Sequence, residues 1–181
     1  MGAVSPREVL DFWFAPEVKA HWFDANPDLD AKIRARFGNS CVDARNGALD
    51  AWAETPEGAL ALLILLDQFS RNLHRGSGEA FASDAKAREI SAQARARGFD
   101  QRVDPDRRTF FYLPLMHSET IEDQRECVRL YEQHGDENSL DFARQHHDII
   151  ARFGRFPHRN HALGRTSNEE ERIFLETHKG F

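Results

Sequence analysis

The chain has 181 residues, 40% of them hydrophobic and 30% charged, which predicts one globular domain over residues 1–181 and excludes a disordered chain. Its formal net charge is −6, so long-range repulsion disfavours nucleic acid and anionic membranes as partners. The longest apolar run, residues 59–66, is too short to cross a membrane.

Two helices that start at prolines are predicted in the first quarter of the chain. Ser5 followed by Pro6 is a typical helix start, and Pro16 is expected to end this helix. Asn26 followed by Pro27 opens a second, longer helix in the same way. The apolar positions recur at helical spacing and are Val9, Leu10, Trp13 and Phe14 in the first helix and Leu29, Ile33, Phe37 and Cys41 in the second.

The segment after Thr55-Pro56 is the best candidate for the centre of the fold. It is predicted to be helical from Gly58 to about Leu73, and it is apolar on every side through Leu66. A helix without a polar face is surrounded by protein, so we expect this one to be buried all round.

The rest of the chain also shows helical periodicity, and strand signals are nearly absent. Pro114 should kink or end the helix that contains it, and Gly98 should cap the one before. The predicted helices cover residues 79–97, 104–115, 121–133, 138–153 and 167–178, with an irregular stretch at 154–165. The pattern predicts an all-α protein of about eight helices, stacked as antiparallel pairs.

The cysteines and the first residues of the chain indicate the cellular compartment. Cys41 and Cys127 have no disulfide-framework or zinc spacing and are expected to be reduced thiols. The first residues lack the basic and apolar regions of a secretory signal. We therefore expect a soluble, cytoplasmic protein, and the sequence does not predict its oligomeric state.

The first polar segment of interest continues the central helix. Asp67, Arg71 and His74 fall on one helical face where the pattern predicts burial. Such groups must be paired, because an unpaired buried charge is costly. One interpretation is an internal salt-bridge network. The other is the wall of a binding site, in which Arg71 or Arg75 holds an anion with Asn72 nearby.

The second segment is an aromatic helix that runs into His117, Ser118 and Glu119. Ser118 is expected to cap the next helix, since a catalytic triad is a spatial arrangement and not a sequence string. His117 is a candidate for proton transfer, with Glu119 and His147 as further catalytic candidates.

The third segment combines histidines with an Arg-rich stretch. His146 shares a stripe with Ile149 and is expected to point inward as a satisfied core residue. Residues 151–167 contain no acidic side chain, and such a stretch can bind a carboxylate or phosphate. The alternative is that its arginines pair with acids elsewhere. The candidate ligand-binding residues here are Arg155, His158, Arg159 and Asn160, beside Arg152 and Arg165.

Metal and cofactor signatures are weak or missing. The histidine spacings do not match a zinc-protease motif, and a dispersed site of His117, Glu119 and His147 is not favoured. The nucleotide-binding and hydrolase motifs do not occur. We therefore expect neither a metal nor a cofactor.

The three segments together resemble a known family. The strings DQFSRNLHRG (67–76), YLPLMHSE (112–119), HHDIIARFGRFPHRN (146–160) and ALGR (162–165), with VLDFWF (9–14), are similar to the bacterial domain-of-unknown-function 924 family. The resemblance implies an all-helical fold like tetratricopeptide-repeat hairpins, and it implies no particular reaction.

Three functions stay open at this point. The first is the binding of an anionic small molecule or peptide in a cavity lined by arginine and histidine. The second is an enzyme that acts on a small anionic metabolite by histidine acid–base chemistry. The third is a purely structural or interaction protein, in which these segments lock helices together.

Overall fold

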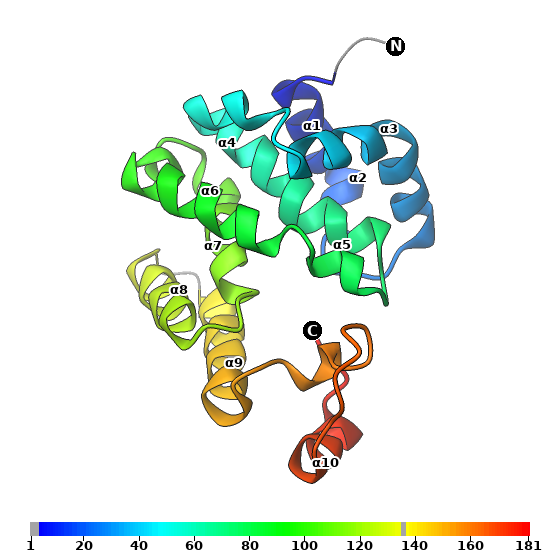
Figure 1. Cartoon of the computed structure of the whole chain (residues 1–181). Coiled ribbons are helices and arrows are strands. Elements are labelled where there is room, and N and C mark those ends of the chain that lie inside the picture. The colour runs from blue at the N-terminus through cyan, green and yellow to red at the C-terminus, as the bar shows by residue number, and fades with distance from the viewer. Residues whose placement is uncertain (1–3, 135–136) are drawn as a thin grey trace. The chain divides into compact units, whose positions relative to one another are not determined.

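The computed structural model describes residues 4–134 and 137–181 (Figure 1). Within these ranges the regular secondary structure is helical and contains no strand, which confirms the predicted all-α class. The α-helices are α1 (Pro6–Trp13), α2 (Pro16–Lys19), α3 (Pro27–Arg45), α4 (Pro56–Leu63), α5 (Ser70–Leu73), α6 (Asp84–Ala96), α7 (Thr109–Met116), α8 (Ile121–His134), α9 (Glu137–Phe153) and α10 (Glu169–Thr177). The shorter helical turns are η1 (Asp50–Glu54), η2 (Ile64–Phe69), η3 (Gly78–Phe81), η4 (Phe99–Gln101), η5 (Pro105–Arg107) and η6 (Pro157–Arg159).

The chain divides into two compact units. The first comprises residues 1–75 and 79–114, and the second comprises residues 76–78 and 115–181. The prediction of one domain over the whole chain stays a prediction, as does repeat-like stacking of the helix pairs. In the part of the chain that the structure describes, no helix has the length and apolar character needed to cross a membrane.

The predicted helix starts are confirmed by their caps. Ser5 Oγ accepts a hydrogen bond from Glu8 N at 3.3 Å, and Glu8 Oε2 accepts one from Ser5 N at 2.8 Å. Asn26 and Thr55 cap α3 and α4 with the side chain alone, which accepts a hydrogen bond from Leu29 N and from Gly58 N. The prediction for Pro16 is wrong in one respect, because α1 ends at Trp13 and Pro16 begins α2. The fixed φ of proline suits the first position of a helix.

The central helix is buried as predicted. Every residue from Gly58 to Ser70 is buried. It is not one regular helix, however, because η2 forms a π-helical turn between α4 and α5. A π-turn is uncommon and often marks a functional or strained place in a helix. Here it carries Asp67 and Gln68, both buried, into the core of the first unit.

The helices before and after the central one differ in detail from the prediction. Cys41 is only half-buried, because Ser40 and Ala44 complete the buried stripe of α3 at a spacing closer to 3.6 residues per turn. The predicted helix at 79–97 splits into η3 and α6, and Gly98 follows it with φ +68° as expected of a helix end. α7 passes through Pro114 and ends two residues later.

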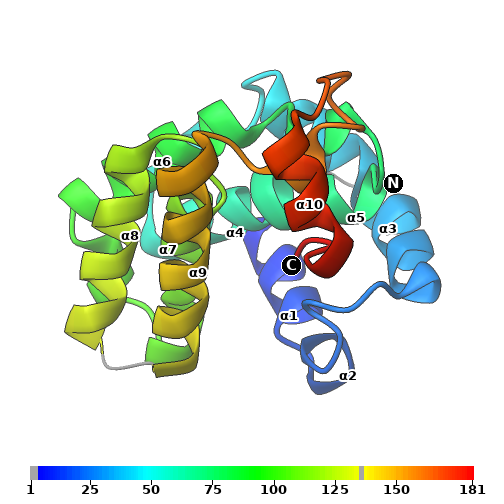
Figure 2. The same ribbon diagram turned by 90° about the horizontal axis from the view of Figure 1, so that it is seen from below.

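The second unit is built on a helix pair. α8 and α9 pack side by side and run in opposite directions (Figure 2). The buried side chains Ile149, Ile150 and Phe156 form its apolar core, against which Phe153 and Phe174 pack. The stretch from Gly154 to α10 is irregular except for η6, as predicted.

Two glycines offer a contrast that tests the packing of the first unit. A Cβ at Gly58 would lie 2.1 Å from the carbonyl oxygen of Trp52, whereas nothing lies within 4 Å of a Cβ at Gly38. We expect Gly58→Ala to lower the free energy of unfolding by about 2 kcal/mol through overpacking. Gly38→Ala, in the middle of α3, should raise it by about 0.5–1 kcal/mol. Urea unfolding measures both, and equal effects of the two changes would contradict this packing.

Candidate functional site

Arg71 of α5 is held between two carboxylates of the first unit. Its Nη1 lies 3.1 Å from Asp67 Oδ1, and its Nη1 and Nη2 donate to the two oxygens of Asp84 at 2.9 and 3.0 Å. Asp67 is only 2% exposed and also accepts from Gln68 Nε2 at 2.6 Å. Burial opposes the charge of Arg71, but the two carboxylates outweigh it and raise the pKa of Arg71.

A second set of bonds ties α5 to α3. Asn72 Nδ2 donates to Asp30 Oδ1 at 2.7 Å, and Arg75 Nε donates to Asp30 Oδ2 at 2.6 Å. Burial alone would raise the pKa of Asp30, but these bonds lower it. His74 follows as the C-cap of α5 and is half-buried. The predicted residues of this segment therefore join α3, α5 and α6, as the network interpretation expects.

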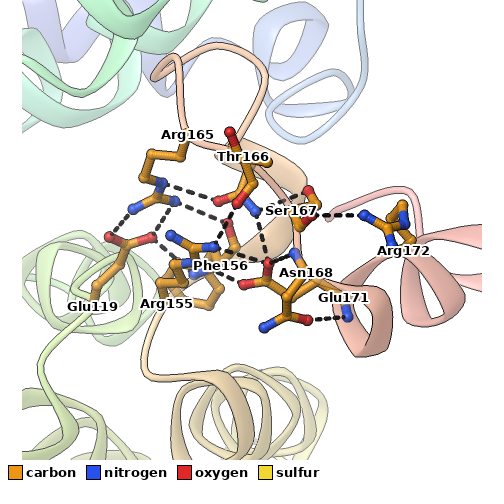
Figure 3. A network of polar contacts seen from close by, with 10 residues as sticks. Glu119, Arg155, Phe156, Arg165, Thr166, Ser167, Asn168, Glu171 and Arg172 are labelled. Atoms are coloured by element: carbon orange, nitrogen blue, oxygen red, sulfur yellow. Dashed lines mark hydrogen bonds and ion pairs between the residues drawn. The ribbon is translucent and has the colours of Figure 1, made fainter.

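Arginines of the Arg-rich stretch pair with carboxylates of the second unit, Glu171 and Glu119 (Figure 3). Arg155 Nε and Nη2 donate to the two oxygens of Glu171 at 2.6 and 2.9 Å. Glu171 is 1% exposed and also accepts from Asn168 N at 2.8 Å and from Asn160 Nδ2 at 3.3 Å. These bonds, with that of Arg155 the strongest, lower the pKa of Glu171 to about 2.

Glu119 takes part in the same network. Arg165 Nη1 and Nη2 donate to its two oxygens at 2.7 and 2.9 Å, and Phe156 N donates at 2.8 Å. Burial would raise the pKa of Glu119, but Arg165 and the Phe156 N–H lower it. Glu119 was a catalytic candidate, and its contacts are those of a carboxylate that anchors the irregular stretch between α9 and α10 (Figure 3).

Four histidines gather in the second unit, and we call His117, His146, His158 and His178 the histidine cluster. The rings of His117 and His146 are 6.5 Å apart, and those of His158 and His178 are 6.4 Å apart and nearly parallel. Phe181 connects the two pairs, since its ring stacks on His146 at 3.6 Å and meets His178 at 4.9 Å. Of these contacts, the one between His178 and Phe181 joins residues close in the sequence. The others join residues far apart in the sequence, so the fold brings the cluster together.

Burial disfavours the charged form of the two inner histidines of the cluster, His146 and His158. His146 is 5% exposed, and its Nδ1 lies 2.7 Å from the carbonyl oxygen of Phe142. A carbonyl oxygen only accepts, so Nδ1 carries the proton of this ring. Nδ1 of His158 is buried without a hydrogen-bond partner. Burial lowers the pKa of His146 to about 3 and that of His158 to about 4.

The cluster also lies in a field of positive charge. The Arg159 guanidinium lies 4.5 Å from the centre of the Phe156 ring, and its charge adds to the lowering of both pKa values. The charged and titratable groups that act on His158 are Arg159, His178, Arg165 and Glu119, and only Glu119 raises its pKa. A negative group beside His158 would therefore be attracted and would favour protonation of its ring.

Within residues 4–134 and 137–181, no group of three or more histidine, cysteine, aspartate or glutamate side chains has an arrangement that could hold a metal ion. His147 pairs instead with the neighbouring Asp148 at 3.1 Å.

Comparison with known proteins places the chain in a family. The family model described as a bacterial protein of unknown function (DUF924) matches residues 9–179. The chain belongs to this family. A solved structure of a protein of unknown function from Agrobacterium tumefaciens is similar, with 41% sequence identity and a TM-score of 0.90 over 96% of this chain and 97% of that one. No curated protein matches.

In this DUF924 family member, the structure brings together only part of the predicted site. His117, His158 and Arg159 lie in or beside the histidine cluster, while Arg155 and Asn160 belong to the Glu171 network. The sequence pattern placed His146 in the core but did not connect it with His178 or Phe181. His178 and Phe181 lie after the last helix, so no helical periodicity indicates which way their side chains point. Their aromatic character was the only feature of the sequence that suggested a role for them.

Proposed function

We propose that the second unit binds an anionic group, such as a carboxylate, sulfate or phosphate on a small molecule or peptide, at the histidine cluster. The observation that carries this proposal is the buried Nδ1 of His158, which has no hydrogen-bond partner and on which the positive charge of Arg159 acts. His146 and His158 are both held uncharged, and the charge of Arg159 acts on each. An anion there would be stabilised by the field, and a protonated His158 would donate a hydrogen bond to it.

The other predicted anion sites are less favourable. Arg71 and Arg75 of the first unit donate to Asp84 and Asp30, and Arg155 donates to Glu171. A new anion would have to compete with a carboxylate already held at 2.6–2.9 Å. These pairs support the structural interpretation for residues 67–75 and for the Glu171 network.

Binding is also better supported than acid–base catalysis by the same residues. A general acid or base works best when its pKa is near the working pH. The pKa values of about 3 for His146 and about 4 for His158 are well below neutrality. Glu119 is held as a carboxylate by Arg165.

Sulfate is a suitable probe because its charge does not change between pH 4.5 and 7.5. We expect sulfate to shift the ring proton resonances of His158 in NMR spectra and to raise the pKa of His158 from about 4 to about 5. Its affinity should therefore increase as the pH falls from 6 to 4.5, because the bound form takes up a proton.

Charge variants test whether the binding is local. Arg159→Gln should weaken sulfate binding by about tenfold, while Arg159→Lys should retain most of it because the charge remains. Arg144→Gln is the control, since Arg144 lies on α9 but pairs with Glu132 at 3.2 Å. Sulfate that leaves all nine histidine resonances unchanged, or that binds Arg159→Gln as well as the wild type, would overturn the proposal.

A further inference from the structure

The ring of Phe181 lies on the histidine cluster like a bound ligand. It stacks on His146 with ring centres 3.6 Å apart and an angle of 18°, while Phe142 meets it edge-on at 6.4 Å. Phe181 is nevertheless 51% exposed, whereas His146 beneath it is 5% exposed. One face of the Phe181 ring therefore contacts His146, and much of the rest of the ring faces solvent. Another aromatic ring can take its place without disturbing the core.

The backbone before Phe181 is shaped to make this contact. Gly180 has φ +116°, a conformation that side-chain-bearing residues rarely adopt, and a Cβ there would lie 3.3 Å from the His158 ring. Gly180 N also donates to His178 Nδ1 at 3.2 Å. The segment from His178 to Phe181 therefore passes close over His158 and lays the Phe181 ring on His146.

We propose that the ligand of the histidine cluster is a flat aromatic ring that carries an anionic group, and that Phe181 occupies the place of this ring in the free protein. This inference rests on the proposed function and adds the chemical class of the ligand. The neutral imidazole of His146 offers a stacking face, and Phe156 lines it edge-on at 5.5 Å. The positive field beside the ring favours a ligand with a negative substituent, which the Phe181 side chain lacks.

Benzoate and cyclohexanecarboxylate are the two probes that separate ring from charge. Both carry one carboxylate and are similar in size, but only benzoate has an aromatic face. In the wild type, the Phe181 ring current should shift the ring protons of His146 upfield. Phe181→Leu should abolish that shift and tighten benzoate binding by about fivefold, the scale of one aromatic contact. Benzoate should then restore the upfield shift, and cyclohexanecarboxylate should not.

Two further variants guard this result. Gly180→Ala keeps the Phe181 ring but strains the segment over His158, so it should also weaken the stack and tighten benzoate binding. Gly180→Ala can be used for the same test if Phe181→Leu does not fold. Phe23→Leu is the control, because Phe23 is a 73% exposed phenylalanine of the first unit and should leave both affinities unchanged.

The outcomes distinguish this inference from the proposed function. If sulfate and both carboxylates bind but benzoate binds no tighter than cyclohexanecarboxylate, the aromatic ligand is ruled out and anion binding stands. If neutral benzyl alcohol binds as well as benzoate, the ring is supported and the anionic group is ruled out. If no probe perturbs the histidine cluster in the wild type, in Phe181→Leu or in Gly180→Ala, both proposals fail.

Discussion

Glu171→Gln is expected to lower the free energy of unfolding by about 2 kcal/mol, because it removes a buried carboxylate that accepts charge-assisted hydrogen bonds from the half-buried Arg155. Glu171 accepts from Arg155, Asn168 and Asn160 at once. Glutamine keeps the size of the side chain but cannot accept both guanidinium bonds. Urea unfolding at pH 7 measures the change.

The neighbouring residue provides a matched control for this variant. Glu170 pairs with Arg152 at 2.8 Å, but both side chains are more than half exposed. Glu170→Gln should therefore cost less than about 1 kcal/mol. Equal effects of Glu170→Gln and Glu171→Gln would show that the network in Figure 3 does not hold the irregular stretch in place.

The carboxylate of Glu171 also makes the free energy of unfolding depend on pH in the acid range. The pKa of Glu171 is lowered from 4.5 to about 2 in the folded chain. A lowered folded-state pKa adds stability that is complete above pH 4.5 and is lost as the pH falls towards 2. The difference in unfolding free energy between wild type and Glu171→Gln should therefore shrink from pH 5 to pH 2.5.

The second large effect is expected for Arg71→Met, at about 3–5 kcal/mol, because it leaves the buried Asp67 and the half-buried Asp84 without their cation. Methionine fills much of the same volume, so the loss reports on charge and not on a cavity. Arg45→Met is the control, since the Arg45–Glu79 pair is 44% and 56% exposed.

A charge-removal variant separates the network from a binding role for Arg71. Removing the carboxylates together with the cation, in Asp67→Leu/Arg71→Met/Asp84→Leu, should recover much of the stability lost in Arg71→Met. If Arg71→Met leaves the thermal midpoint unchanged and instead abolishes sulfate binding, Arg71 belongs to a site and not to a network.

The features of the fold that could be predicted from the sequence are mostly local. The helix starts at Ser5, Asn26 and Thr55 could be predicted because a cap joins residues only two or three positions apart. The burial of the segment from Gly58 to Leu66 followed from its apolar residues, since hydrophobic burial has no direction and needs no particular partner. The all-α class followed from the sum of such signals.

The choice of partners for the charged side chains depends on the tertiary structure. Arg71 meets Asp84, Arg155 meets Glu171 and Arg165 meets Glu119. Pairing with acids was one of two interpretations that the sequence allowed for these arginines. Many acids were available, and the packing of helices selects among them. The π-helical turn at Ile64–Phe69 and the stacking of Phe181 on His146 gave no periodic signal either. Both depend on where distant segments lie in space, which local propensity does not encode.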